Sequence, residues 1–175
     1  MFRSSGSRSD FDLHALYEAL ERARRQRGIS WRALADEVNY RRTVLRPIAV
    51  STITGLETKP LGEGDGILQM LIWLDRTPES FVPGVADADS ERYRLPKLSV
   101  GQILRWDTKA LHGAVDGQRR ARALTWSGLA RELRGFTPGM LTNLAHGPKI
   151  GFPRGMRLVR WLDRPAVAFT RIARW

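Results

Sequence analysis

The chain has 175 residues, of which 42% are hydrophobic and 27% are charged, and its formal net charge is +11. This composition is typical of a globular protein with one or two domains, and the absence of cysteine excludes a disulfide framework and a cysteine zinc site. The excess of Arg and Lys, with a sequence pI near 11.2, favours nucleic acid as a partner.

Residues 1–10 are rich in Ser and Arg and contain no apolar core, so we expect a flexible tail there and no signal peptide. The longest strongly apolar run, residues 67–74, is interrupted by Gln69. It is far shorter than the roughly 20 residues that span a bilayer. We therefore expect a cytoplasmic protein that makes no membrane contact.

Two amphipathic helices are predicted at the start of the first domain. Apolar residues recur at helical spacing over residues 12–27, and Gly28 is suited to the C′ position that ends this helix. Ser30 is a suitable N-cap for a second helix over residues 31–38, because its hydroxyl can accept a hydrogen bond from the free amides of the first turn.

A third, short helix is predicted over residues 50–57, and a fourth over residues 66–74. Ile53 and Leu56 of the third helix face the core. Three small polar side chains are then left facing outward: Ser51, Thr52 and Thr54. Ile72 lies off the core face of the fourth helix, which predicts an exposed apolar spot suited to a protein contact.

Residues 39–49 separate the second helix from the third and contain the helix breaker Pro47 and three arginines: Arg41, Arg42 and Arg46. One interpretation is a plain surface loop, because insertions in surface loops cost little free energy. The other interpretation is a basic flap that grips DNA phosphates beside the third helix. The sequence leaves both interpretations open.

Residues 84–105 are expected to form a linker, since their charge changes from acidic to basic and Gly84 and Pro96 interrupt regular structure. A short helix is expected within it at residues 100–104. A chain of this length can extend over about 70 Å, at about 3.3 Å per residue. The sequence therefore does not fix the geometry between the two domains.

Residues 125–147 read TWSGLARELRGFTPGMLTNLAHG. Thr125 suits the N-cap of one helix, Gly135 ends it, and Thr137 followed by Pro138 begins another, because the missing N–H of Pro costs nothing at the first helical position. Two short helices joined by a turn that contains Gly are typical of a helix-turn-helix, whose second helix can enter a DNA major groove.

The chain contains this pattern twice. An offset of 95 aligns residues 11–38 with 106–133, and 11 of these 28 pairs are identical. Further along, an offset of 88 aligns the two WLDR sequences at 73–76 and 161–164, so seven residues are inserted in the first copy. We predict an all-α protein with two tandem helix-turn-helix domains of four to five helices each. Their expected bounds are 11–83, with the basic insertion at 39–49, and 106–175.

Both copies share the elements [IL]-[ST]-W-x-x-L-A, then [IL]-T-x-L, then Pro and a W-L-D-R helix closed by Phe. This order of elements resembles the Cro/phage-repressor (Xre-type) helix-turn-helix superfamily, and it is most similar to actinobacterial and rhizobial members. The resemblance covers about residues 13–81 and 110–169. It implies an all-α domain of four or five helices that binds duplex DNA, most often as a transcription regulator. Many members have a phosphate-contacting Gln where this chain has Trp31 and Trp126, so that contact is not carried over.

We therefore interpret the protein as a bacterial, sequence-specific regulator of transcription that binds double-stranded DNA with two recognition helices in major grooves. The candidate DNA-binding residues are polar or basic side chains expected on or beside the two helix-turn-helix motifs. They are Arg41, Arg42, Arg46, Ser51, Thr52, Thr54, Lys59, Ser127, Arg131, Gly139, Met140, Thr142, Asn143, His146 and Lys149.

Two alternatives remain open: an accessory or architectural DNA-binding factor of the recombination directionality type, and a protein-binding adaptor on the same fold. RNA polymerase or another regulatory protein is a further expected partner. The active form is either a monomer with a pseudo-two-fold repeat or a homodimer. The three histidines show no pattern of catalytic partners, so we expect no enzyme, catalytic residue, metal or cofactor.

Charge is distributed unequally between the two copies. Residues 11–83 carry ten basic and ten acidic side chains, whereas residues 106–175 carry 13 basic and four acidic ones. Because neutralisation of phosphates supplies most non-specific DNA affinity, the second copy is expected to anchor the chain on DNA.

Overall fold

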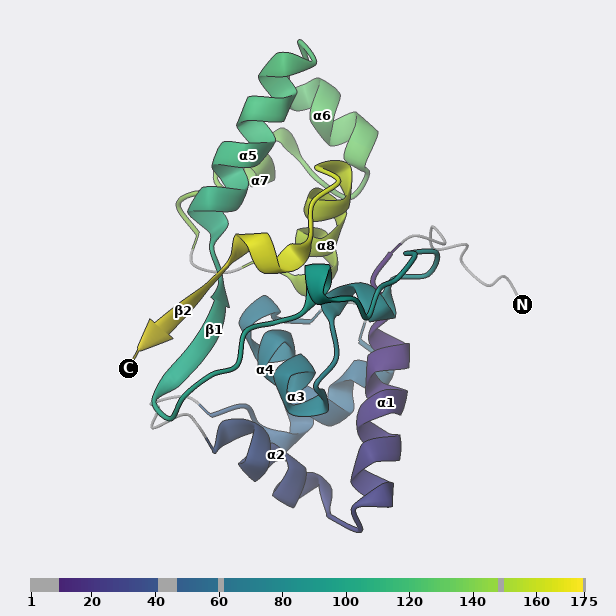
Figure 1. The fold of residues 1–175 in the computed structure, drawn as a ribbon. Helices are drawn as coiled ribbons and strands as arrows, with labels where there is room; N and C mark the ends of the chain where they lie inside the picture. Colours follow the sequence, from purple (N-terminus) through teal and green to yellow (C-terminus); the bar gives the residue numbers. More distant parts are fainter. Residues whose placement is uncertain (1–9, 41–46, 60–61, 148–149, 175) are drawn as a thin grey trace, which may run out of the picture.

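The structure, a computed structural model, describes residues 10–40, 47–59, 62–147 and 150–174. In these residues it is mostly helical, with the α-helices α1 to α8, several short 3-10 turns and one two-stranded sheet (Figure 1). The expected all-α class is confirmed at this coarse level, but the sheet was not predicted. Within the described part of the chain, no helix is both long and apolar enough to cross a membrane.

The first repeat consists of four helices and two 3-10 turns. They are α1 (Leu13–Gln26), α2 (Trp31–Asn39), α3 (Val50–Thr54), η1 (Gly55–Glu57), α4 (Gly64–Leu74) and η2 (Pro78–Phe81). The side chain of Asp12 caps α1 by accepting from the Ala15 amide, and Ser30 caps α2 by accepting from the Ala33 amide. Gly28 has φ of 63°, the left-handed conformation expected after a helix C-terminus.

The second repeat consists of the corresponding elements. They are α5 (Thr108–Ala121), α6 (Trp126–Leu133), α7 (Pro138–Thr142), α8 (Phe152–Trp161) and the 3-10 turn η4 (Ala166–Phe169). Asp107 caps α5 and Thr125 caps α6, in the same geometry as their counterparts in the first repeat. The N-cap predictions at Ser30 and Thr125 are confirmed.

Each repeat contains the same group of one arginine, one glutamate and one tryptophan. In the first repeat, Arg27 and Trp73 both donate to the carboxylate of Glu37. In the second repeat, Arg122 donates to Glu132 at 2.8 Å, and Trp161 donates to the same oxygen at 3.2 Å. These half-buried tryptophans thus pack against the core and hold the second helix of each repeat to its fourth. The duplication seen in the sequence therefore extends to side-chain contacts.

The segment expected to be a linker ends in a strand. β1 (Gln102–Trp106) pairs antiparallel with β2 (Thr170–Arg174), in a register that places Gln102 opposite Arg174 (Figure 1). The helix expected at 100–104 is wrong, because β1 occupies this segment and extends across the expected boundary at residue 105. Earlier in this segment, only the 3-10 turn η3 (Glu91–Tyr93) is regular.

Strand β1 forms because both of its edges have partners. β2 satisfies one edge, and α4 satisfies the other: Gln69 donates to the Leu104 carbonyl at 2.7 Å, and Asp65 accepts from the Trp106 amide at 3.0 Å. Ile103, Leu104 and Trp106 are also buried. These partners are distant in sequence, so local patterns cannot indicate the strand.

The two repeats meet at the starts of α4 and α8. The Gly64 amide donates to the Ile150 carbonyl at 3.0 Å, and the Phe152 amide donates to the Gly62 carbonyl at 2.9 Å. The offset of 88 that relates the repeats pairs Gly62 with Ile150 and Gly64 with Phe152, so each of these two bonds is the counterpart of the other. A pseudo-two-fold axis therefore passes between Glu63 and Gly151, the two residues of this antiparallel bridge.

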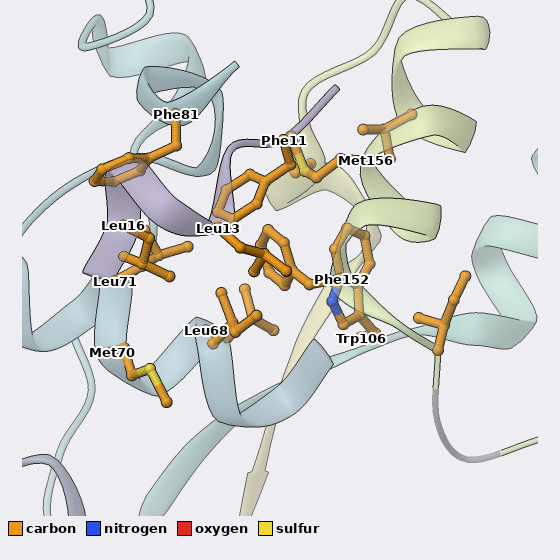
Figure 2. Packing of buried hydrophobic residues seen from close by; sticks show 14 of the residues in the cluster. Phe11, Leu13, Leu16, Leu68, Met70, Leu71, Phe81, Trp106, Phe152 and Met156 are labelled. Atoms are coloured by element: carbon orange, nitrogen blue, oxygen red, sulfur yellow. The ribbon is translucent and has the colours of Figure 1, made fainter. Parts of the chain in front are cut away.

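A single hydrophobic core continues through this contact. Phe152 is fully buried. Its ring centroid lies 4.6 Å from that of Phe11 and 5.5 Å from that of Trp106 (Figure 2). Buried residues of both repeats belong to one cluster. The geometry between the repeats, which the sequence did not fix, is thus set by packing. Ile72, expected to be exposed, is half-buried and packs against this core.

The buried carboxyl group of Glu79 bridges the two repeats. Its Oε1 accepts from the Ala166 amide at 2.7 Å, and its Oε2 is buried without a hydrogen-bond partner among the described residues. Burial raises the pKa of Glu79 above its usual value, although the Ala166 amide, Arg160 and Arg92 oppose this shift.

We expect the stability of the chain to depend on the protonation of Glu79. The pKa of Glu79 is higher in the folded chain than in the unfolded chain. Glu79 therefore makes its full contribution to the free energy of unfolding at pH values below the unfolded pKa. That contribution is lost as the pH rises through the folded pKa. Glu79→Gln keeps the acceptor for Ala166 without a buried charge, so it should remove this loss and be more stable than wild type at neutral pH. Urea unfolding of both proteins between pH 4 and pH 8 measures the difference. A constant difference across this range would contradict the role of Glu79.

Candidate nucleic-acid interface

The turn between α6 and α7 depends on two residues with positive φ. Arg134 has φ of 52° and Gly135 has φ of 75°. A Cβ on Gly135 would collide with the guanidinium of Arg157, which donates to the Arg134 carbonyl at 3.2 Å. Arg157 is itself held by Asp10, at 2.8 and 2.9 Å. Glycine at 135 thus suits the positive φ and leaves room for the guanidinium of Arg157, and Asp10, which holds that guanidinium, supports the turn.

Helix α7 presents most of its polar side chains to solvent. Thr137 caps it by accepting from the Met140 amide at 3.2 Å, and Leu141 anchors it in the core. Of the predicted residues here, Met140 is half-buried and four are exposed: Gly139, Thr142, Asn143 and His146. The Thr142 hydroxyl donates to the Gly139 carbonyl at 3.2 Å, so Asn143 is the better placed hydrogen-bonding group for a ligand.

Helix α3 presents a smaller polar surface than expected. Ser51 and Thr52 are exposed. Thr54, expected to face outward, is half-buried, and its hydroxyl donates to the Val50 carbonyl at 3.2 Å. Thr54 is therefore less available to a ligand than Ser51 and Thr52, because the proton of its hydroxyl is used within the helix. No side chain caps α3, since Ala49 occupies the N-cap position.

The inserted segment before α3 is fastened at both ends by one residue that sequence reasoning missed. Asn39 donates to the Ile48 carbonyl at 2.9 Å and accepts from the Ile48 amide at 2.8 Å. An Asn at the end of a helix, before an insertion, is the signal that could have indicated this contact. The arginines of the predicted flap, Arg41, Arg42 and Arg46, lie outside the described residues.

Three of the remaining predicted contacts are exposed: Lys59, Ser127 and Arg131. The Lys59 side chain lies along η1, where a Cβ on Gly55 would be 3.2 Å from its Cε. Lys149 lies outside the described part of the chain.

The charge difference between the repeats lies on their surfaces. On α2, Arg32 is 3.6 Å from Asp36, whereas the equivalent positions on α6 hold Ser127 and Arg131, neither of which is acidic. His14 and Glu18 of α1 form a pair at 3.4 Å, whereas the equivalent positions on α5 hold Lys109 and Gly113. The second repeat therefore offers the more basic surface.

The described residues contain no group of three or more His, Cys, Asp or Glu side chains that could hold a metal ion. A cavity of about 540 Å³ lies between α2, α4 and Leu98, and it is lined by Arg27, Glu37 and Trp73. The polar atoms of these three residues already pair with one another.

Comparisons with known proteins add no family assignment. No protein-family model matches the chain, and neither the curated proteins nor the solved structures include a significant match. The candidate interface thus depends on the sequence pattern and on the geometry of the two helix pairs.

The unequal caps of α3 and α7 generate a testable difference. Thr137→Ala removes a cap and should lower the free energy of unfolding by about 0.5–2 kcal/mol, whereas Ala49→Ser supplies the missing cap and should raise it by up to about 1 kcal/mol. Thr52→Ala, at an exposed position that caps no helix, is the control and should stay within about 0.5 kcal/mol of wild type. Urea unfolding measures all three. Equal effects of the three substitutions would show that the caps are unimportant.

Proposed function

We propose that the protein is a sequence-specific, double-stranded DNA-binding regulator of transcription, and that α2–α3 and α6–α7 are its helix-turn-helix motifs. In this proposal α3 and α7 enter major grooves, where side chains can distinguish base pairs by their hydrogen-bonding edges. It builds on the Xre-type resemblance of both repeats.

The pseudo-two-fold relation between the repeats carries most of this proposal. A two-fold rotation includes no shift along its axis. The pseudo-two-fold axis between Glu63 and Gly151 therefore places α3 and α7 at the same level along that axis. Duplex DNA has two-fold axes of the same kind, and two-fold related reading helices meet half-sites one helical turn, or about 34 Å, apart. One chain thus supplies the arrangement that such regulators usually build by dimerisation.

The exposed side chains of the two reading helices suit base recognition. Asn143 presents an amide that can pair bidentately with N6 and N7 of adenine, and the hydroxyls of Ser51 and Thr52 can pair with several bases. At the equivalent positions the other helix has a different residue in each case: Gly139 for Ser51, Met140 for Thr52 and Gly55 for Asn143. The two helices are therefore expected to prefer different base sequences.

Surface charge supports nucleic acid over a protein adaptor for the second repeat. Arg131 is exposed beside α7 and has no ion-pair partner among the described residues. The first repeat is close to neutral, and this favours it as the place where RNA polymerase or another regulatory protein would bind. An architectural factor would use the same DNA surface but would show no preferred sequence.

Selection of bound duplexes from a random pool tests the proposed function. We expect enrichment of a defined sequence, and Asn143→Ala should relax the preference at one position and weaken binding by about 1–3 kcal/mol. Circular dichroism provides the control for folding. Binding without any enriched sequence would favour an architectural factor, and no binding would favour an adaptor.

The dependence of binding on salt tests the role of the cations. Each phosphate contact contributes about 0.9 to the slope of log K against log salt. Arg131→Ala should therefore flatten the slope by about one unit, and joint replacement of Arg41, Arg42 and Arg46 by Ala by up to about 2–3 units. Arg120→Ala is the matched control, because Arg120 is paired with Asp116 at 3.0 Å. A slope that all these variants leave unaltered would contradict the assigned contacts.

A further inference from the structure

The contact between the repeats, here called the joint, is built from unlike residues at equivalent positions. The offset of 88 relates Gly64 to Phe152, and the offset of 95 relates Phe11 to Trp106. Phe152 packs on Phe11, with ring centroids 4.6 Å apart (Figure 2). In the equivalent contact, the Trp106 ring lies against Gly64, where a Cβ would be 2.6 Å from Trp106 Cδ1 and 2.5 Å from the Ile150 carbonyl oxygen.

These residues make the joint specific for one copy of each repeat. In a joint between two first repeats, Gly64 would face Phe11 and leave a gap. In a joint between two second repeats, Phe152 would face Trp106, and both rings would need the same space. A symmetric dimer has identical contacts on both sides of its axis, so this joint is adapted to join the two repeats of one chain.

The polar contacts at the joint are unlike on its two sides as well. On one side, Asp10 pairs with Arg157 at 2.8 Å. On the equivalent side, Arg105 lies 3.8 Å from Asp65. On one side, Glu79 accepts from the Ala166 amide. The equivalent pair cannot form this bond, because Val167 has no carboxylate and Pro78 has no N–H.

Rotation of one repeat against the other is opposed by both backbone and core. The reciprocal bonds at Gly64 and Phe152 hold the backbones, and β1 connects the repeats while packing against α4. Domains of one chain usually move unless their interface is large and hydrophobic. Here Phe152, Trp106 and Met156 are at most 2% exposed, so rotation would open the core.

From these contacts we infer that the joint determines sequence specificity by fixing the distance and orientation of α3 and α7. One chain then recognises a bipartite duplex site, made of two unlike half-sites in inverted orientation at a single spacing. This inference rests on the proposed function and adds the class of DNA site and the stoichiometry. A monomer is the active form, and the homodimer is not required.

The spacing of the half-sites gives the direct test on the wild-type protein. In duplexes that carry the selected site, base pairs are added or removed between the halves. One base pair moves a half-site by about 3.4 Å and turns it by about 35°. We expect binding to weaken at least tenfold for a change of one or two base pairs, with one chain bound per duplex. Affinity that stays within twofold across this series, or two chains per duplex, would overturn the inference.

Two glycine substitutions in the same helix provide a matched pair. Gly64→Ala places a methyl group against Trp106 and the Ile150 carbonyl, whereas Gly66→Ala meets only ordinary contact, 3.9 Å from Ile48 Cδ1. The Gly64→Ala variant should lose less affinity than wild type when the spacing of the half-sites is altered, and it should keep the base preference at each half-site. The Gly66→Ala variant should behave as wild type. Equal spacing tolerance of the two variants would contradict a role for the joint. If Gly64→Ala does not fold, the wild-type spacing series still decides.

A measurement without DNA separates failure of this inference from failure of the proposed function. The chain has no cysteine, so Ser51→Cys with Thr142→Cys allows two spin labels to be placed on α3 and α7. Electron–electron double resonance should give one narrow distribution of distances between the two labels. Gly64→Ala should broaden that distribution. A broad distribution in the otherwise unchanged chain would refute the rigid joint even if DNA binds. A narrow distribution without selection of any duplex would refute the DNA-binding function alone.

Discussion

The reciprocal pair of backbone hydrogen bonds between Gly64 and Ile150 and between Phe152 and Gly62 is the constraint on which the rest of the molecule depends. These bonds place equivalent residues of two repeats face to face, and therefore set the rotation that relates one repeat to the other. The Phe152 ring then fills the space between the repeats and makes their two small cores continuous. A repeat of about 70 residues buries limited apolar surface by itself, so this shared core matters for stability.

Within each repeat, a second recurring interaction keeps the short helices in place. The carboxylates of Glu37 and Glu132 each receive hydrogen bonds from one arginine and one tryptophan. The pKa of each glutamate is lowered, mainly by the hydrogen bond from its arginine. Five-residue helices such as α3 and α7 are too short to be stable alone. Their positions depend on these neighbouring contacts and on single buried anchors, Ile53 and Leu141.

Sequence reasoning predicted the parts of the fold that local chemistry determines. The caps at Ser30, Thr125 and Thr137 and the helix end at Gly28 follow from residues within one turn. It failed where distant residues decide. Strand β1 exists because α4 and β2 satisfy its edges. Gly64 lies outside the fourth helix as predicted, at residues 66–74, and its missing side chain leaves the space that Trp106 fills. Of the candidate interface, Thr54 and Met140 are half-buried rather than exposed, and the Thr54 hydroxyl donates to the carbonyl four residues earlier.

The central claim is that one chain presents two unlike reading helices to one side of a DNA duplex. Hydroxyl-radical footprinting of the protein on a duplex that it selects tests this claim most directly. We expect two protected patches on one face of the duplex, with centres about 10 base pairs apart, as for two reading helices in successive major grooves. A single protected patch, or protection spread over all faces of the duplex, would contradict the claim.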